Sequence, residues 1–153
     1  PSCLHVGLVV QNELDGCWSS LWGAAHTFVQ HHGKPEDVIP LMRVVVENDN
    51  DAIRARLKKY LPDLVISRYH HFLEAVKMEG LKIPEAFAYI SLNVNEDFEG
   101  ATGIRHRRDM LGATAVDVLN SLLHRNHKGP DDVSLGTQVD GIWEEGTTLP
   151  VRL

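Results

Sequence analysis

The sequence predicts an α/β fold with a mostly parallel, doubly wound sheet flanked by helices. Short apolar segments alternate with amphipathic segments in the order β-α-β-α-β-α-β. Strands that are apolar on both sides are typical of a parallel sheet covered by helices. The connecting loops are short, and together with the right-handed crossover rule they favour double winding.

Strands and helices alternate as far as Leu92. The expected strands, each a short and nearly continuous apolar run, are Leu4–Val10, Val38–Val46, Leu64–Ile66 and Ala86–Leu92. The expected helices have apolar residues at helical spacing and cover Trp18–His32, a segment that begins near Ala52, and Tyr69–Glu79. Gly33 and Gly80 are plausible C-caps, and Leu61-Pro62 stops the second helix.

The alternation ends after the fourth strand. A polar loop leads to a short extended piece at Gly103–His106 and then to a strong helix at Asp109–Arg125. The apolar positions of this helix wrap around much of its circumference, more than one sheet face requires. Two strand-like pieces close the chain, at Ser134–Val139 and Ile142–Trp143.

Composition limits the class of protein. The chain has 153 residues, of which 43% are hydrophobic, and a formal net charge of −6. These values are typical of one soluble globular domain. No apolar run reaches the length of a membrane span. The negative net charge argues against binding of DNA by this chain alone. Cys3 and Cys17 are too few for a disulfide framework, so we expect reduced thiols and a cytoplasmic protein.

Motifs for catalysis, nucleotide binding and metal binding are missing. The sequence contains no G-x-G-x-x-G, Walker or G-x-S-x-G pattern. The histidine pairs His31-His32 and His70-His71 are adjacent, and adjacent side chains on a helix point about 100° apart rather than toward one ion. We therefore expect no catalytic residue, no cofactor and no metal.

Candidate ligand-binding residues follow the predicted strands, because ligands of α/β sheets bind at the carboxyl ends of the strands. Arg68 and Tyr69 follow the third strand, and Asn93 follows the fourth. His106 lies in the basic cluster Arg105–Arg108, which is either a solvated turn or turned toward a ligand. Trp18, on the first helix, either packs in the core or forms a platform for a sugar.

The segment from Leu81 to Leu149 resembles the C-terminal end of lac-repressor-family (LacI/GalR) transcriptional regulators. The blocks that carry the resemblance are GLKIPE at Gly80–Glu85, AFAYISL at Ala86–Leu92, GIRHRRDMLGATAVDVL at Gly103–Leu119 and GIWEEGTTL at Gly141–Leu149. Upstream, Pro62–Ile66 is similar to the strand before the ligand-facing turn of the family.

The resemblance implies a periplasmic-binding-protein-like (type I) effector domain, in which a ligand cleft lies between two α/β lobes. Residues 1–103 would form the C-terminal lobe, residues 104–128 a crossover and a helix of the N-terminal lobe, and residues 129–153 the return strands and tail. The DNA-binding head and most of the N-terminal lobe would lie outside this chain. We therefore expect the helix to be displaced, swapped or packed against a neighbour.

The resemblance also implies a small-molecule effector, possibly sugar-like. Family members usually carry Asp at the position of Asn93, often an Asn or Asp pair near Arg68 and Tyr69, and commonly Gln at His106. Sugar-binding members carry Arg near Leu21. Because these residue types differ here, the effector differs from a simple hexose or the response has been lost.

A homodimer is a further implication. In the family the C-terminal lobes dimerise, and the third helix is a candidate interface. Its residues that would face a partner are His70, Leu73, Val76 and Lys77. The alternative is an ordinary sheet-covering helix.

Two functions from different classes follow. The first is the ligand-sensing portion of a transcriptional regulator, not an enzyme, that couples small-molecule binding to operator affinity and contacts DNA only through a helix-turn-helix outside this chain. The second is a free-standing small α/β enzyme of the hydrolase or isomerase type. Its strongest feature is the polar set Ser67, Arg68 and Asn93, but no acid–base or nucleophile–base pair is recognisable.

Overall fold

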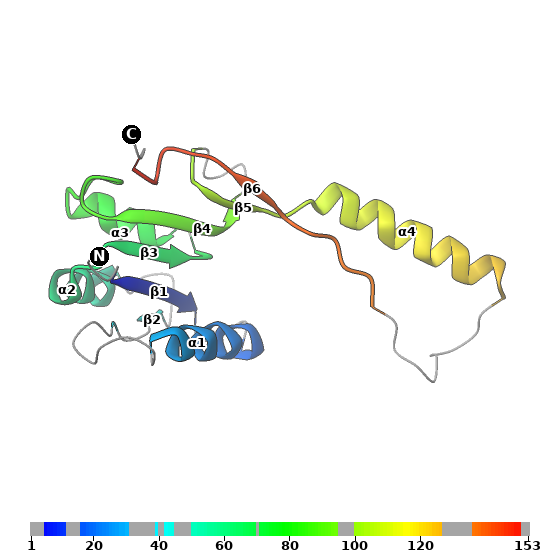
Figure 1. Cartoon of the computed structure of the whole chain (residues 1–153), viewed down its shortest axis with the longest axis horizontal. Coiled ribbons are helices and arrows are strands. Elements are labelled where there is room, and N and C mark those ends of the chain that lie inside the picture. Colours follow the sequence, from blue (N-terminus) through cyan, green and yellow to red (C-terminus); the bar gives the residue numbers. More distant parts are fainter. Residues whose placement is uncertain are drawn as a thin grey trace.

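The described residues form one sheet of six strands, in the order β2-β1-β3-β4-β5-β6 (Figure 1). The computed structural model describes residues 5–11, 16–30, 39, 42–44, 50–69, 71–94, 100–126 and 136–150. The strands are β1 (Val6–Gln11), β2 (Met42–Val44), β3 (Leu64–Ser67), β4 (Ala88–Val94), β5 (Gly103–Arg105) and β6 (Ile142–Glu144). Neighbouring strands are parallel except β5 and β6, which are antiparallel.

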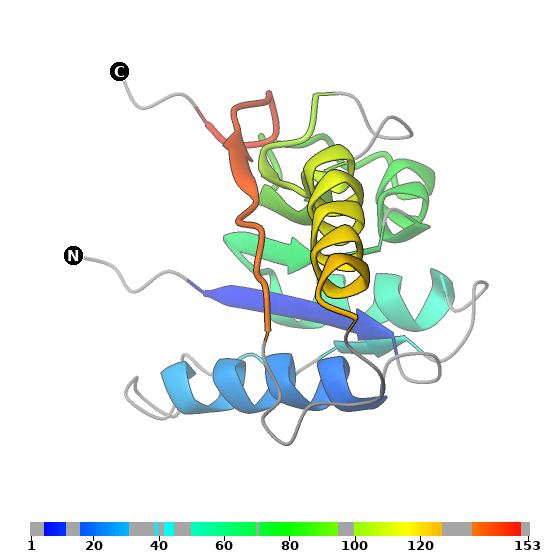
Figure 2. The same ribbon diagram turned by 90° about the vertical axis from the view of Figure 1, so that its right-hand side faces the viewer.

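Three helices connect the parallel strands, and a fourth lies between β5 and β6. They are α1 (Gly16–Gln30), α2 (Asn50–Tyr60), α3 (His71–Met78) and α4 (Arg108–His124). Since the chain moves from β1 outward to β2 and then back past β1 to β3, right-handed connections place α1 on one face and α2 and α3 on the other. Figure 2 shows α2 and α3 together on one side of the sheet. This is the doubly wound α/β fold that the sequence predicts.

The main core lies between the sheet and the helices α2 and α3. Its members are the buried side chains Val9, Ile53, Leu57, Val65, Phe72, Leu73, Val76, Phe87 and Tyr89. The Phe72 ring is stacked on the Tyr89 ring, with centroids 6.1 Å apart and an interplanar angle of 13°. The sheet contributes Val9 of β1, Val65 of β3 and Tyr89 of β4 to this core, and the register places these three on one face.

Helix α1 packs mainly on β1, at the opposite face of the sheet. Its C-terminal end is tied to the start of that strand, because His26 Nε2 and Gln30 Nε2 each lie 3.1 Å from the carbonyl oxygen of Val6. Leu8 of β1 is buried on this side. The parts of β3, β4 and β5 that face the same side are only half-buried.

Helix α4 extends away from the sheet (Figure 1). None of its 17 residues is buried. The structure therefore shows this helix displaced from its own sheet, which is one of the arrangements that the sequence analysis expects. No helix among the described residues is long and apolar enough to cross a membrane.

Two expected strands differ from the structure. Of the second expected strand, Val38–Val46, residues 42–44 form β2 and Ile39 is buried without regular structure, while the others lie outside the described residues. The strand expected at Ser134–Val139 is wrong for residues 136–139, which have no regular structure; residues 134 and 135 lie outside the described part. Residues 136–138 are exposed, so no apolar surface favours an extended pairing there.

Candidate ligand-binding site at the carboxyl edge of the sheet

The carboxyl ends of β1, β3, β4 and β5 meet at one edge of the sheet, because these strands are parallel. The chain turns in opposite directions after β1 and β3, which are neighbours. Ligands of open α/β sheets bind in the crevice at such a switch point. The side chains that follow these strands therefore define the candidate site.

The end of β3 is held by a serine turn. Ser67 is completely buried, and its hydroxyl accepts a hydrogen bond of 3.0 Å from the backbone N–H of Tyr69. The same hydroxyl donates to the carbonyl oxygen of Tyr69 over 3.3 Å. This double contact fixes the backbone at Tyr69, which is half-buried, while Arg68 between them is exposed. Ser67 acts as a turn-forming group, which weakens its interpretation as a catalytic nucleophile.

The end of β4 repeats this arrangement one strand along. The Ser91 hydroxyl accepts a hydrogen bond of 3.2 Å from the backbone N–H of Asn93. Ser67 and Ser91 are direct neighbours in the β3–β4 register. Tyr69 and Asn93 therefore each lie two residues beyond paired serines of adjacent strands, Tyr69 past the end of β3 and Asn93 in the last residues of β4.

A buried tyrosine lies beneath the two serines. Tyr89 is fully buried, and burial raises its pKa to about 12, while the neighbouring Ser91 and Ser67 hydroxyls act on the pKa in the opposite direction. The sequence analysis did not select Tyr89 or Ser91. The signal was present: Tyr89 and Ser91 are two residues apart, as are Val65 and Ser67, and equal spacing on adjacent strands places all four on one face.

The end of β5 brings two further side chains to Asn93. Nε2 of His106 lies 3.1 Å from the carbonyl oxygen of Leu92, so this ring nitrogen is the donor. Nη2 of Arg108 lies 3.4 Å from Oδ1 of Asn93. The structure thus brings together Asn93 and His106, as the sequence suggests, and adds Arg108. The nearby Arg105 pairs instead with Glu144 of β6, and this hydrogen bond lowers the pKa of the Glu144 carboxyl.

No described contact joins the two candidate residues on α1 to the other candidate residues. Leu21 is 57% exposed, and no described contact joins it to Asn93 or His106. Trp18 belongs to the first turns of α1, but its side chain lies outside the described residues. The candidate site is therefore restricted to residues at the ends of β3, β4 and β5.

The side chains at this edge suit the binding of a polar ligand. An amide, an imidazole and guanidinium groups donate hydrogen bonds well, and their charge-assisted bonds suit hydroxyl, carboxylate or phosphate oxygens. Among the described residues, no group of three or more His, Cys, Asp or Glu side chains is placed to hold a metal ion.

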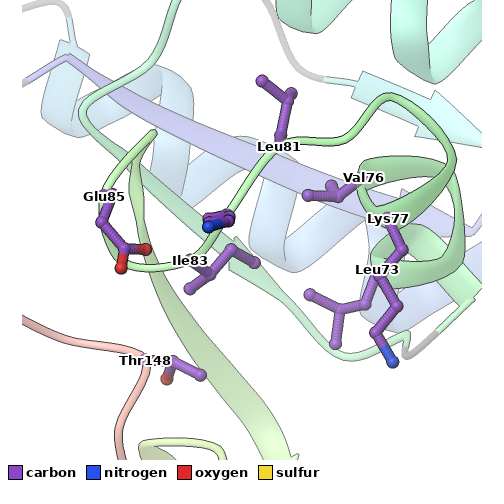
Figure 3. Close-up of a pocket in the computed structure, with 8 residues that line it drawn as sticks. Leu73, Val76, Lys77, Leu81, Ile83, Glu85 and Thr148 are labelled. Carbon is purple, nitrogen blue, oxygen red and sulfur yellow. The ribbon is translucent and has the colours of Figure 1, made fainter.

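A cavity of about 350 Å³ lies away from this edge, at the C-terminal end of α3 (Figure 3). Its apolar wall contains Leu73, Val76, Leu81 and Ile83, and its rim contains Lys77, Lys82, Glu85 and Thr148. Thr148 joins this wall to the sheet, because its hydroxyl donates to the carbonyl oxygen of Tyr89 over 2.8 Å.

The residues expected at a dimer interface lie beside this cavity. Leu73 and Val76 are 4% and 1% exposed and belong to the core of the same chain, whereas Lys77 is exposed. His70 lies outside the described residues. Contact with a partner through α3 stays a prediction, and Lys77 is the exposed one of the three described residues.

The arrangement of strands, helices and polar strand ends defines a periplasmic-binding-protein-like α/β lobe. No family model and no curated protein sequence matches the chain. Solved structures of transcription regulators do match its fold. The transcription regulator CcpA of Lactococcus lactis aligns with a TM-score of 0.64 and 17% identity, over 94% of this chain and 55% of that one.

Two of the similar structures contain a ligand. The Lac repressor bound to ONPG in the repressed state aligns with a TM-score of 0.69 and 15% identity, over 95% of this chain and 46% of that one. A LacI family transcriptional regulator from Enterococcus faecium with bound ribose aligns with a TM-score of 0.65 and 15% identity, over 97% of this chain and 58% of that one. The chain spans about half the length of these regulators and has the fold of that half.

Proposed function

We propose that this chain is the ligand-sensing part of a LacI-family transcriptional regulator, which couples binding of a small molecule to affinity for DNA. The observation that carries the proposal is the contact of Arg108 with Asn93 at the carboxyl edge of the sheet, where His106 also bonds to the carbonyl oxygen of Leu92. The fold supports it, because the similar solved structures are regulators rather than enzymes.

The proposed organisation divides the chain at the edge that carries the site. Residues 1–103 form the C-terminal lobe, residues 104–128 cross to a second lobe and supply its helix, and residues 129–153 return to the first. The undocked α4 supports this division, since a helix with no buried residue contributes nothing to the core of the first lobe. Contact with DNA belongs to a head outside these residues, in a cytoplasmic protein.

The proposed effector is a small molecule rich in oxygen, such as a monosaccharide or its phosphate. Donors predominate among the side chains that converge at the site. Asn93 is neutral, so a strong bond from a carboxylate to a sugar hydroxyl is replaced by an amide that both donates and accepts. Arg108 and the exposed Arg68 favour an effector that also carries an anionic group.

We also propose that the regulator acts as a homodimer through the exposed side of α3, including Lys77. The cavity beside that helix supports this proposal, because an apolar concave wall with a charged rim is a suitable contact surface.

A thermal-shift and calorimetric screen tests the effector proposal. The probes are ribose, glucose, galactose and their phosphates. We expect at least one to bind, and Asn93→Ala to weaken its binding about tenfold, the effect of losing one hydrogen bond of about 1.4 kcal/mol. Asn120→Ala is the matched control, since Asn120 is an exposed asparagine of α4. Equal effects of the two variants, or no binding by any probe, contradict the proposal.

A further inference from the structure

Strand β4 has an extra residue where it ends beside β5. Ser91 pairs with Gly103 and Val94 pairs with Arg105, so two residues of β4 lie opposite the single residue between the β5 partners. This arrangement is a β-bulge, and bulges are rare between parallel strands. Bulges often lie next to functional sites, because they redirect a side chain out of the regular alternation. The bulge of β4 consists of Leu92–Asn93, and the second of these two residues belongs to the candidate site.

Burial along β4 shows the same insertion of one residue. Tyr89 and Ser91 are fully buried on the face toward α2 and α3, while Ile90 between them is half-buried. Regular alternation would bury Asn93 next. Instead Asn93 is half-buried, and Val94 is 3% exposed. The bulge therefore turns Asn93 away from the core, and Val94 takes the buried position in its place.

The two strands are held close together just before the bulge. The backbone N–H of Ser91 donates to the carbonyl oxygen of Thr102 over 2.9 Å, and the backbone N–H of Thr102 donates to the Thr148 hydroxyl over 2.9 Å. A Cβ on Gly103 would clash with the carbonyl oxygen of Ser91, so glycine permits the close approach of the strands here. These contacts fix β5 against β4 before the bulge, but none of them reaches the bulge itself.

Two side chains that follow β5 contact the bulge. Nε2 of His106 lies 3.1 Å from the carbonyl oxygen of Leu92, and Nη2 of Arg108 lies 3.4 Å from Oδ1 of Asn93. A carbonyl oxygen only accepts, so His106 carries its ring proton on Nε2. The Ser91 hydroxyl accepts a hydrogen bond of 3.2 Å from the backbone N–H of Asn93. The His106 bond therefore acts on the backbone of the bulge, and the Arg108 contact acts on its asparagine side chain.

We propose that His106 is a positioning residue, which holds the backbone of the bulge so that Asn93 is presented to the effector. It acts through Leu92 and Asn93, and contact between the imidazole and the effector is not needed. Because His106 is exposed, its replacement is expected to loosen the bulge without unfolding the core. The role of His106 in binding rests on the proposed function, whereas its contact with the bulge does not.

Amide hydrogen exchange of the 153-residue chain, measured by NMR, tests the contact without any ligand. The side-chain nitrogen of glutamine reaches the place of histidine Nε2, whereas that of asparagine reaches only the place of Nδ1. His106→Asn is therefore expected to speed exchange at Asn93 and Val94 about fivefold, the effect of losing one hydrogen bond of about 1 kcal/mol. His106→Gln should keep the parent rate. His124→Asn, in the exposed last turn of α4, is the matched control and should keep it also.

Two results of the exchange experiment overturn the contact. The first is an equal rate in His106→Asn and in the parent chain. The second is a rate in His106→Gln that is as fast as in His106→Asn. The nitrogen NMR signals of the imidazole provide an independent check, since a ring protonated only on Nδ1 contradicts donation from Nε2 to Leu92.

Calorimetry with the monosaccharide phosphates separates positioning from direct contact. His106→Asn should weaken binding of the probe about fivefold in the parent chain and have no further effect in an Asn93→Ala background, because it acts through Asn93. Equal weakening in both backgrounds means that His106 contacts the probe itself and overturns the proposal, as does no weakening in either. If every probe fails to bind, the proposed function is refuted, and the exchange rates alone decide the contact of His106 with the bulge.

Discussion

Nη2 of Arg108, in the first turn of α4, lies 3.4 Å from Oδ1 of Asn93 at the end of β4. This contact links the helix that leaves the sheet to the strand end that carries the candidate site. A ligand that bonds to Asn93 therefore competes with, or adds to, a bond that orients α4. Such a connection between a site and an element that leaves the sheet is what coupling of ligand binding to a distant surface requires.

Asn93→Asp is expected to strengthen this link, because a carboxylate forms a charge-assisted bond with Arg108. The pair is exposed, so the gain in free energy of unfolding is about 0.2–1 kcal/mol. Urea unfolding of Asn93→Asp, Arg108→Ala and the double variant gives the coupling energy. An equal effect of Asn93→Asp with and without Arg108 contradicts the assignment, and Asn120→Asp is the control for the added charge.

Gly103→Ala is expected to lower the free energy of unfolding by about 1–3 kcal/mol, the range for overpacking a core. A Cβ at this position would lie only 1.9 Å from the carbonyl oxygen of Ser91, so β4 and β5 must separate. Gly136→Ala is the matched control, since its Cβ meets no atom within 4 Å. Urea unfolding compares the two, and similar midpoints contradict the β4–β5 register.

The ion pairs of Glu79 predict how stability depends on acid. The hydrogen bond from Lys58 and then that from Arg54 hold the pKa of the Glu79 carboxyl below its ordinary value of 4.5. Since the folded pKa is the lower one, the contribution to stability is complete above about pH 4.5 and is lost as the pH falls through the folded pKa.

Glu79→Gln should therefore lower the urea midpoint at neutral pH and reduce the further drop between pH 5 and pH 3. Urea midpoints over this interval provide the measurement, with the exposed Glu145→Gln as control. A drop of the same size in Glu79→Gln and in the parent chain disagrees with a carboxylate stabilised by Lys58 and Arg54.

The buried Tyr89 hydroxyl is expected to make the free energy of unfolding fall as the pH rises in the alkaline range. Burial raises its pKa to about 12, above the ordinary value of 10.0. Its contribution to stability is present below pH 10 and is lost as the pH rises toward 12. Absorbance at the tyrosinate band should show a step near pH 12 that is missing in Tyr89→Phe. A Tyr89→Phe variant that keeps this step places the late titration on another residue.

The strand order explains which parts of this account could be predicted from sequence. Continuous apolar runs predicted β1, β3 and β4, and the rule that ligands bind at strand ends selected Arg68, Tyr69 and Asn93. His106 was selected as a member of the basic cluster Arg105–Arg108. Lateral neighbours depend on packing between distant segments, which local patterns do not specify. The roles of Tyr89 and Ser91 and the contact of Arg108 with Asn93 therefore emerged only from the structure.

Helix α4 also shows that a local sequence pattern does not specify which surfaces pack together. Its apolar positions predicted a surface that must be covered, and the structure places this surface away from the chain's own sheet. Amphipathicity shows that a helix needs a partner surface, but it does not specify which one. The strand expected at Ser134–Val139 was wrong for its described residues, because a short alternating segment forms a strand only where a neighbouring edge is available.

The most direct test of the ligand-sensing proposal is an amide map of the chain by NMR, with each monosaccharide and monosaccharide phosphate added in turn. The account predicts that at least one probe shifts the amide signals of residues 67–69, 93 and 106–108, and leaves those around Leu73 and Thr148 unchanged. Shifts confined to the cavity beside α3, or no shifts with any probe, would contradict a ligand site at the carboxyl edge of the sheet.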